Sequence, residues 1–131
     1  MAKSTDFLDT NCLLRYVLGD NEAQAKKTEQ LIRHGVQVEV AVFFEFVWVL
    51  QSFYKMNRQQ VHERLKIIIE DKRIGCERKL LDEVGQHYLL YPQISFLDIY
   101  LSLMAQRKGG YLRTFDENLS KKLSLHVHLI V

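Results

Sequence analysis

Ten residues near the middle of the chain read Ala41-Val42-Phe43-Phe44-Glu45-Phe46-Val47-Trp48-Val49-Leu50. Every neighbour of Glu45 at helical or strand spacing is apolar, so the segment predicts a buried helix that shields one carboxylate from water. Burying an isolated carboxylate costs on the order of several kcal/mol unless another charge compensates it. No Lys, Arg or His lies within four residues of Glu45. The compensating charge is therefore expected to be a distant basic side chain or a bound cation.

Three further acids stand where a strand is predicted to end or a helix to begin. Asp9 closes one predicted strand, and Asp116 follows another. Asp98 comes three residues after Ser95, in the first turn of a helix that Ser95 is placed to cap. In an open parallel sheet, active sites collect outside the carboxyl ends of the strands. We therefore expect these acids to converge with Glu45.

Four carboxylates in one place would repel each other and raise each other's pKa values unless a divalent cation kept them ionised. Hard oxygen ligands without a Cys or His cluster suit Mg²⁺, with Mn²⁺ as a possible substitute. Cys12 and Cys76 have neither zinc-ligand spacing nor the density of a disulfide framework. The pattern thus predicts a magnesium-type site, and free thiols in a reducing cytoplasm.

The whole chain is expected to form one α/β domain over residues 1–131. Strands are predicted near residues 5–9, 36–40, 74–76, 111–115 and 125–131. Helices are predicted near residues 11–18, 21–34, 42–54, 57–69, 80–89, 96–108 and 117–123. This alternation predicts a three-layer α/β/α fold with a mostly parallel central sheet of four to five strands. No secretory signal and no apolar stretch long enough to span a bilayer is present, so we expect a cytoplasmic protein that does not contact membranes.

Four segments resemble the PIN domain in their residues, order and spacing, and within that family they resemble the VapC-type toxin ribonucleases of toxin–antitoxin modules. They are Phe7-Leu8-Asp9-Thr10-Asn11, Phe44-Glu45-Phe46-Val47-Trp48-Val49-Leu50, Ser95-Phe96-Leu97-Asp98 and Thr114-Phe115-Asp116. The resemblance implies a divalent-metal-dependent endoribonuclease that leaves 5′-phosphate and 3′-hydroxyl ends. It also implies a protein that is commonly dimeric and is held inactive by a cognate antitoxin.

Phosphodiester hydrolysis needs an in-line water, neutralised phosphoryl oxygens and help for the leaving oxygen. A cation held by carboxylates meets all three needs, so we predict Asp9 and Asp98 to be the principal metal ligands. Glu45 is predicted to be a ligand or the base that orients the attacking water, and Asp116 a second-site or outer ligand. Hydrogen bonds that orient these carboxylates are expected from Asn11 and Thr114.

Net charge is only +2, which is too small to indicate a nucleic-acid-binding protein by itself. Basic residues nevertheless occur near the predicted acids in sequence, and phosphate contacts are predicted for Arg15, Arg107, Lys108 and Arg113. Lys26 and Lys27 are interpreted as ordinary exposed helix charges. The aromatic side chains of residues 43–54 are interpreted mostly as core, and any exposed part would suit a dimer or antitoxin surface.

Two alternatives from other classes stay open. One is a non-catalytic PIN-like module that binds RNA or protein without cutting. The other is a phospho-acceptor receiver domain, which is also a small parallel-sheet protein with acids at strand ends, although Glu45 would have no role in it.

Overall fold

The computed structural model describes residues 6–131 and divides the chain into two compact units, Met1–Arg78 and Lys79–Val131. The part of the predicted first strand at residue 5 lies outside the described residues. No helix among residues 6–131 has both the length and the apolar character needed to cross a membrane.

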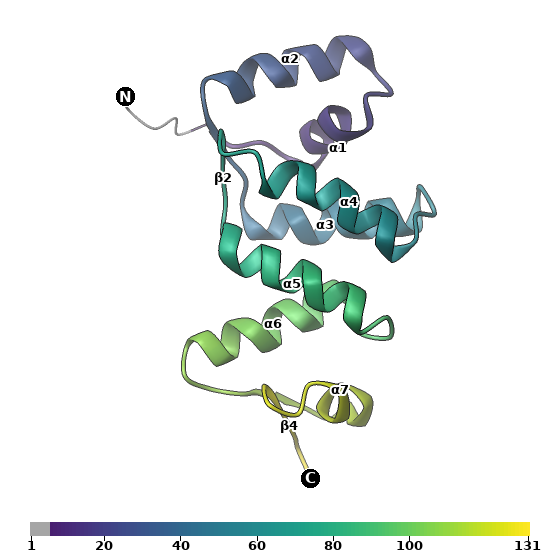
Figure 1. Cartoon of the computed structure of the whole chain (residues 1–131), viewed down its shortest axis with the longest axis vertical. Coiled ribbons are helices and arrows are strands. Elements are labelled where there is room, and N and C mark those ends of the chain that lie inside the picture. The colour runs from purple at the N-terminus through teal and green to yellow at the C-terminus, as the bar shows by residue number, and fades with distance from the viewer. Residues whose placement is uncertain (1–5) are drawn as a thin grey trace. The chain divides into compact units, whose positions relative to one another are not determined.

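The first unit has helices and short strands in alternation. Its elements are α1 (Thr10–Leu18), α2 (Glu22–Arg33), β1 (Val36–Gln37), α3 (Val40–Ser52), α4 (Arg58–Ile69) and β2 (Ile74–Gly75). Helix α1 packs against α2 and α3, and α3 packs against α4 (Figure 1). The predicted helices of this half are thus confirmed, with ends that differ by one or two residues.

Strand β1 lies between two parallel neighbours. On one side Gln37 forms a parallel bridge with Phe7. On the other side Val36 pairs with Ile74 and Gln37 pairs with Gly75, again in parallel. Because the three segments run in the same direction, the chain leaves all of them at the same edge. Helices α1 and α3 both begin beyond that edge.

Local hydrogen bonds explain where several of these helices begin and end. The Asn57 side chain accepts the Gln60 N–H at 2.9 Å, and the Gln60 side chain accepts the Asn57 N–H at 2.9 Å, which completes a capping box at the start of α4. The Asn21 side chain accepts the Gln24 N–H at 3.1 Å and caps α2. Gly19 ends α1 with φ of +66°, a left-handed conformation that favours glycine.

Helix α3 presents one face to the core and another to solvent. Its buried residues are Phe43, Phe46, Val47 and Leu50. Its exposed residues recur at helical spacing and are Ala41, Glu45, Trp48 and Ser52. Trp48 is 64% exposed and Phe53, just after the helix, is 74% exposed, so these two side chains form the exposed part of an aromatic stretch that was predicted to be mostly core. The segment is apolar almost throughout and therefore carries no period that identifies the outward face.

The second unit contains a helix pair followed by a small parallel sheet. Its elements are α5 (Arg78–Leu90, which begins at the last residue of the first unit), α6 (Phe96–Arg107), β3 (Leu112–Thr114), α7 (Glu117–Lys122) and β4 (Val127–Leu129). Strands β3 and β4 are parallel, with Leu112 opposite Val127 and Thr114 opposite Leu129. Beside this pair, the rings of Tyr111 and His128 stack with centroids 3.9 Å apart.

The α/β class with parallel strands is confirmed, whereas a single sheet of four to five strands is not. Among the described residues the named strands are two or three residues long and form two separate two-stranded parallel sheets. The sequence overestimated strand length because apolar residues next to a strand need not join its hydrogen-bond ladder, as Phe115 at 77% exposure and Leu125 at 80% exposure show. The three-layer arrangement and the single domain over residues 1–131 stay predictions.

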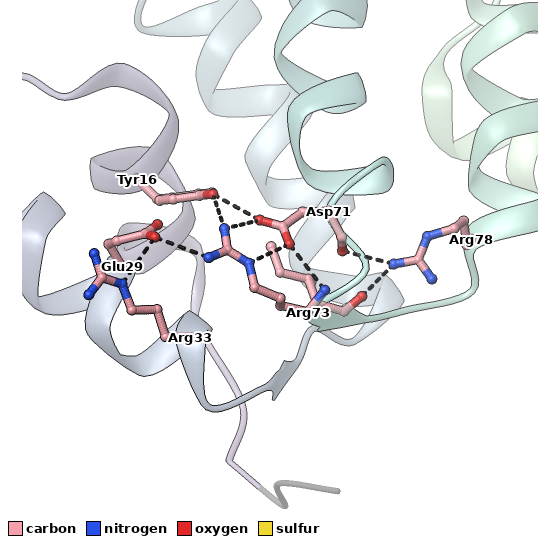
Figure 2. Close-up of polar contacts among 7 residues, drawn as sticks. Tyr16, Glu29, Arg33, Asp71, Arg73 and Arg78 are labelled. Atoms are coloured by element: carbon pink, nitrogen blue, oxygen red, sulfur yellow. Dashed lines mark hydrogen bonds and ion pairs between the residues drawn. The ribbon is translucent and has the colours of Figure 1, made fainter.

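A polar network joins α1, α2 and the turn before β2 (Figure 2). Arg73 Nε donates to Asp71 Oδ1 at 2.9 Å and Arg73 Nη2 donates to Asp71 Oδ2 at 2.8 Å, which is the bidentate geometry of a strong ion pair. Tyr16 Oη donates to Asp71 Oδ2 at 2.9 Å, and Arg73 Nη1 donates to Glu29 Oε1 at 3.1 Å. The Arg73 hydrogen bonds, opposed by burial and assisted by Tyr16, lower the pKa of Asp71 to about 2.

We expect Asp71→Asn to lower the free energy of unfolding by about 1–2 kcal/mol at pH 7, because Arg73 and Tyr16 lose their charged acceptor. The folded-state pKa of Asp71 lies below its ordinary value of 3.8, so its contribution is present above about pH 4 and is lost as pH falls toward 2. Urea unfolding of both proteins at about pH 7, 4 and 2.5 measures the difference. Asp82→Asn, which removes an exposed acid hydrogen-bonded to Gln86, is the control. If the unfolding free energies of wild type and Asp71→Asn differ by the same amount at all three pH values, the charge of Asp71 is not what stabilises the network.

Candidate functional site

Asp9 caps helix α1 and stays open to solvent. Its Oδ1 accepts the Cys12 backbone N–H at 3.0 Å, with the Asp9 backbone in an extended conformation. The Cys12 backbone hydrogen bond lowers the pKa of Asp9, assisted by the Cys12 thiol and the Asn11 backbone N–H and opposed by burial. Asp9 is therefore an exposed, ionised carboxylate at neutral pH. Burial, followed by the neighbouring Asp9, raises the pKa of the Cys12 thiol, so the thiol is protonated.

Glu45 is exposed, so the expectation that it is shielded from water was wrong. It lies on the outward face of α3, one turn before Trp48, while Phe43 and Phe46 point to the core. The argument that burial of Glu45 demands a compensating cation therefore fails. Its exposed position leaves the side chain open to a ligand from solution.

Asp98 lies in the first turn of α6, where the sequence placed it. The Ser95 side chain accepts the Asp98 backbone N–H at 3.1 Å and caps the helix, as predicted. The Asp98 side chain is half-buried, and the Ser102 hydroxyl donates to the Asp98 backbone carbonyl at 2.7 Å. Both contacts are with the backbone of Asp98, so they fix its position and leave the carboxylate oxygens for other partners.

Asp116 caps the short helix α7. Its Oδ1 accepts the Leu119 N–H at 3.0 Å, and the side chain is exposed. The Thr114 hydroxyl accepts the Asp116 backbone N–H at 3.0 Å. Thr114 therefore holds the Asp116 backbone, and Asn11 acts on Asp9 through its own backbone N–H. Both residues were predicted to orient carboxylates, whereas the Thr114 hydroxyl contacts the backbone of Asp116 and Asn11 contributes its backbone N–H to Asp9.

The predicted acids are divided equally between the two units. Asp9 and Glu45 belong to the first unit, in which α1 packs against α3, and Asp98 and Asp116 belong to the second. Over its described residues, neither unit by itself groups three or more His, Cys, Asp or Glu side chains that could hold a metal ion. Convergence of all four carboxylates stays a prediction.

The predicted phosphate-binding cations differ in how strongly acids engage them. Arg15 Nη1 donates to both carboxylate oxygens of Asp20, at 2.8 and 2.9 Å. Arg107 Nη2 donates to Glu83 at 2.8 Å. Lys108 and Arg113 are exposed. Acids thus already neutralise two of the four cations that the sequence indicated for RNA.

A hollow of about 310 Å³ opens beside Asp9 between α1 and α2. Its lining residues are Asp9, Asn11, Cys12, Arg15, Gln24, Lys27, Thr28 and Leu31. Sequence reasoning missed the contribution of α2 and interpreted Lys27 as an ordinary exposed charge. The sequence indicated this contribution only through the spacing of residues 24, 27, 28 and 31, which places them on one face of a helix. That face lies against the hollow that contains Asp9.

A family model described as the PIN domain matches residues 7–122. The chain belongs to the PIN domain family. It is also similar to a VapC ribonuclease of Aquifex aeolicus (strain VF5), with 28% identity over 107 residues that cover 78% of this chain and 79% of that protein. No solved structure matches the chain significantly. The PIN domain match contains all four predicted acids, and the resemblance first seen in the four sequence segments is confirmed.

In this PIN domain Asp9 is both a helix cap and a candidate catalytic group, and two substitutions separate these roles. Asn is as good an N-cap as Asp, whereas Ala cannot accept the Cys12 N–H. We expect Asp9→Ala to lower the free energy of unfolding by about 1 kcal/mol and Asp9→Asn to change it by only a few tenths. Urea unfolding at about pH 7 measures both. Equal losses in the two variants would show that charge, and not the cap, is what Asp9 contributes to stability.

Proposed function

We propose that this PIN-domain protein is a divalent-metal-dependent endoribonuclease, and that it is the toxin of a toxin–antitoxin pair. The observation that carries the proposal is the family match over residues 7–122, which contains the acids at positions 9, 45, 98 and 116. Similarity to a VapC ribonuclease over most of both chains supports RNA as the substrate. On this basis we further propose a homodimer with a cognate antitoxin as partner.

The four acids fit a hard divalent cation by their chemistry. All are carboxylates, and all are exposed or half-buried, so a hydrated ion can reach them. Asp9 is ionised at neutral pH, and hydrogen bonds lower its pKa from the ordinary value. Mg²⁺ prefers such oxygen ligands and keeps several waters, and Mn²⁺ accepts the same ligands. When bound, the ion would polarise the phosphoryl oxygen and favour formation of hydroxide from water.

Each acid has a proposed role that its position supports. Asp9 and Asp98 lie in or just before the first turn of a helix, where a capping contact holds the carboxylate of Asp9 and the backbone of Asp98, and we propose both as principal ligands. The exposed carboxylate of Glu45 is proposed to be a ligand or to accept a proton from the attacking water. Asp116 is proposed as an outer ligand, with Thr114 holding its backbone.

Wild-type protein with Mg²⁺ should cut single-stranded RNA and leave 5′-phosphate and 3′-hydroxyl ends. Cleavage should stop when a chelator removes the metal and return when Mg²⁺ or Mn²⁺ is added. Asp9→Asn should lower the cleavage rate by at least about 100-fold, because it removes a negatively charged ligand while keeping the α1 cap. Gel analysis of end-labelled RNA measures the rate, and circular dichroism checks that the variant is folded.

Asp82 lies on α5 outside the predicted set of acids, so Asp82→Asn is the matched control and should leave cleavage unchanged. RNA binding without cleavage by wild type would favour the non-catalytic module. Phosphorylation of an Asp by a small phosphodonor would favour the receiver domain. Equal cleavage by wild type and Asp9→Asn would refute the proposed site.

Expression of the wild-type chain in a bacterial host should arrest growth, because RNA cleavage depletes functional RNA. Asp9→Asn expressed to the same level should not arrest growth. Co-expression of a small DNA-binding protein encoded beside this chain should restore growth to cells that express wild type. Growth curves and immunoblots of the expressed protein measure the outcome. Equal arrest by both proteins would contradict a toxin that acts by RNA cleavage.

A further inference from the structure

The hollow between α1 and α2 is lined by negatively and positively charged side chains. In this it differs from the set of four predicted metal ligands, which are all acids. Asp9 contributes a carboxylate from the start of α1, and Lys27 contributes an ammonium from α2. Asn11 and Gln24 add amide groups, and Leu31, 47% exposed, adds an apolar surface. The exposed positions of these five residues leave the hollow open to a ligand from solution.

Lys27 is the cation of this hollow that is available to a ligand. Arg15 also lines it, but both carboxylate oxygens of Asp20 accept hydrogen bonds from Arg15. Within residues 6–131, Lys27 forms no ion pair with an acid. Its neighbour Lys26 pairs with Glu22 at 3.5 Å and does not line the hollow. The two lysines are adjacent in sequence and differ in both respects.

These groups suit a nucleotide of a single RNA strand. A phosphate would gain an ion pair with Lys27, and amides donate hydrogen bonds to phosphate or ribose oxygens. The apolar side of Leu31 can contact a ribose or a base face. A volume of about 310 Å³ is at the lower end of the range for ligand sites, which is enough for one nucleotide unit. The ionised Asp9 would repel a phosphate that approached without a cation, and Lys27 offsets that repulsion.

We propose that this hollow is an RNA-positioning subsite, in which Lys27 binds the phosphate next to the one that is cut and Gln24 assists it. The proposal rests on the proposed ribonuclease function and adds to it a residue on α2 that positions the strand. Lys27 does not take part in the bond-breaking step. Its contribution is to hold the RNA backbone beside Asp9, so its loss should weaken binding more than it slows the chemical step.

The test compares Lys27→Ala with its matched control, Lys26→Ala. In the active protein, Lys27→Ala should raise KM for a single-stranded RNA by about 5-fold and leave kcat within about 2-fold. Lys26→Ala should leave both parameters unchanged. Lys27→Arg should restore most of the affinity, because it keeps the positive charge. Urea unfolding should give the same midpoint for all three variants, since both lysines are exposed.

A second measurement separates a phosphate contact from a general loss of structure. Binding of single-stranded RNA is measured by fluorescence anisotropy at several salt concentrations in the Asp9→Asn background, which does not cut. The slope of log affinity against log salt should become shallower by about 0.7 in Lys27→Ala, as expected for the loss of one phosphate contact with a single strand. Lys26→Ala should keep the parent slope.

The outcomes distinguish the subsite from the function on which it rests. If wild type cuts RNA but Lys27→Ala and Lys26→Ala behave alike, the subsite proposal is wrong and the ribonuclease stands. If Lys27→Ala weakens binding with an unchanged salt slope, Lys27 does not contact phosphate and the proposal is also wrong. If the Asp9→Asn parent binds RNA and wild type cuts none, the proposed function fails and the subsite fails with it, and a smaller salt slope in Lys27→Ala would then show only that Lys27 contacts a phosphate.

Discussion

The parallel pairing of β1 on both of its sides is the constraint on which the first unit depends. Gln37 is bridged to Phe7 on one side and paired with Gly75 on the other, so the backbone there has hydrogen-bond partners in both directions. Because all three segments run the same way, the chain must leave them at one edge. That edge is where Asp9 caps α1 and where the chain continues into α3, so the positions of Asp9 and of the start of α3 follow from strand direction.

Helix capping links the stability of this PIN domain to its proposed chemistry. Asp9 and Asp116 each accept a backbone N–H at the start of a helix, at 3.0 Å in both cases. Such a contact holds the carboxylate in place, and at Asp9 it also lowers the pKa and so favours the charged form. One carboxylate oxygen is used by the helix while the other can bind a ligand. The same side chain therefore stabilises local structure and supplies negative charge at neutral pH.

Which basic residues are available to bind RNA depends on the acids around each of them and not on the net charge of the chain. The chain has a net charge of only +2, and two of its candidate cations, Arg15 and Arg107, are held by acids. The nearby carboxylate offsets the charge of an arginine in such a pair, which weakens the attraction of that arginine for a phosphate. Lys27 lies beside Asp9 without an ion pair of that kind among the described residues, which makes it the better candidate for holding a strand.

The sequence by itself determined the order of helices, several of their caps and the family. Asn57 and Ser95 mark helix starts through local hydrogen bonds, which depend only on residues three positions apart. Three of the four acids were recognisable because they follow strands or open helices, and Glu45 because it interrupts an apolar run, all in a PIN-like order. Tertiary structure alone decided that Glu45 and Trp48 face outward and that Lys27 shares a hollow with Asp9. An apolar run carries no signal for its outward face, and proximity between α1 and α2 depends on how they pack.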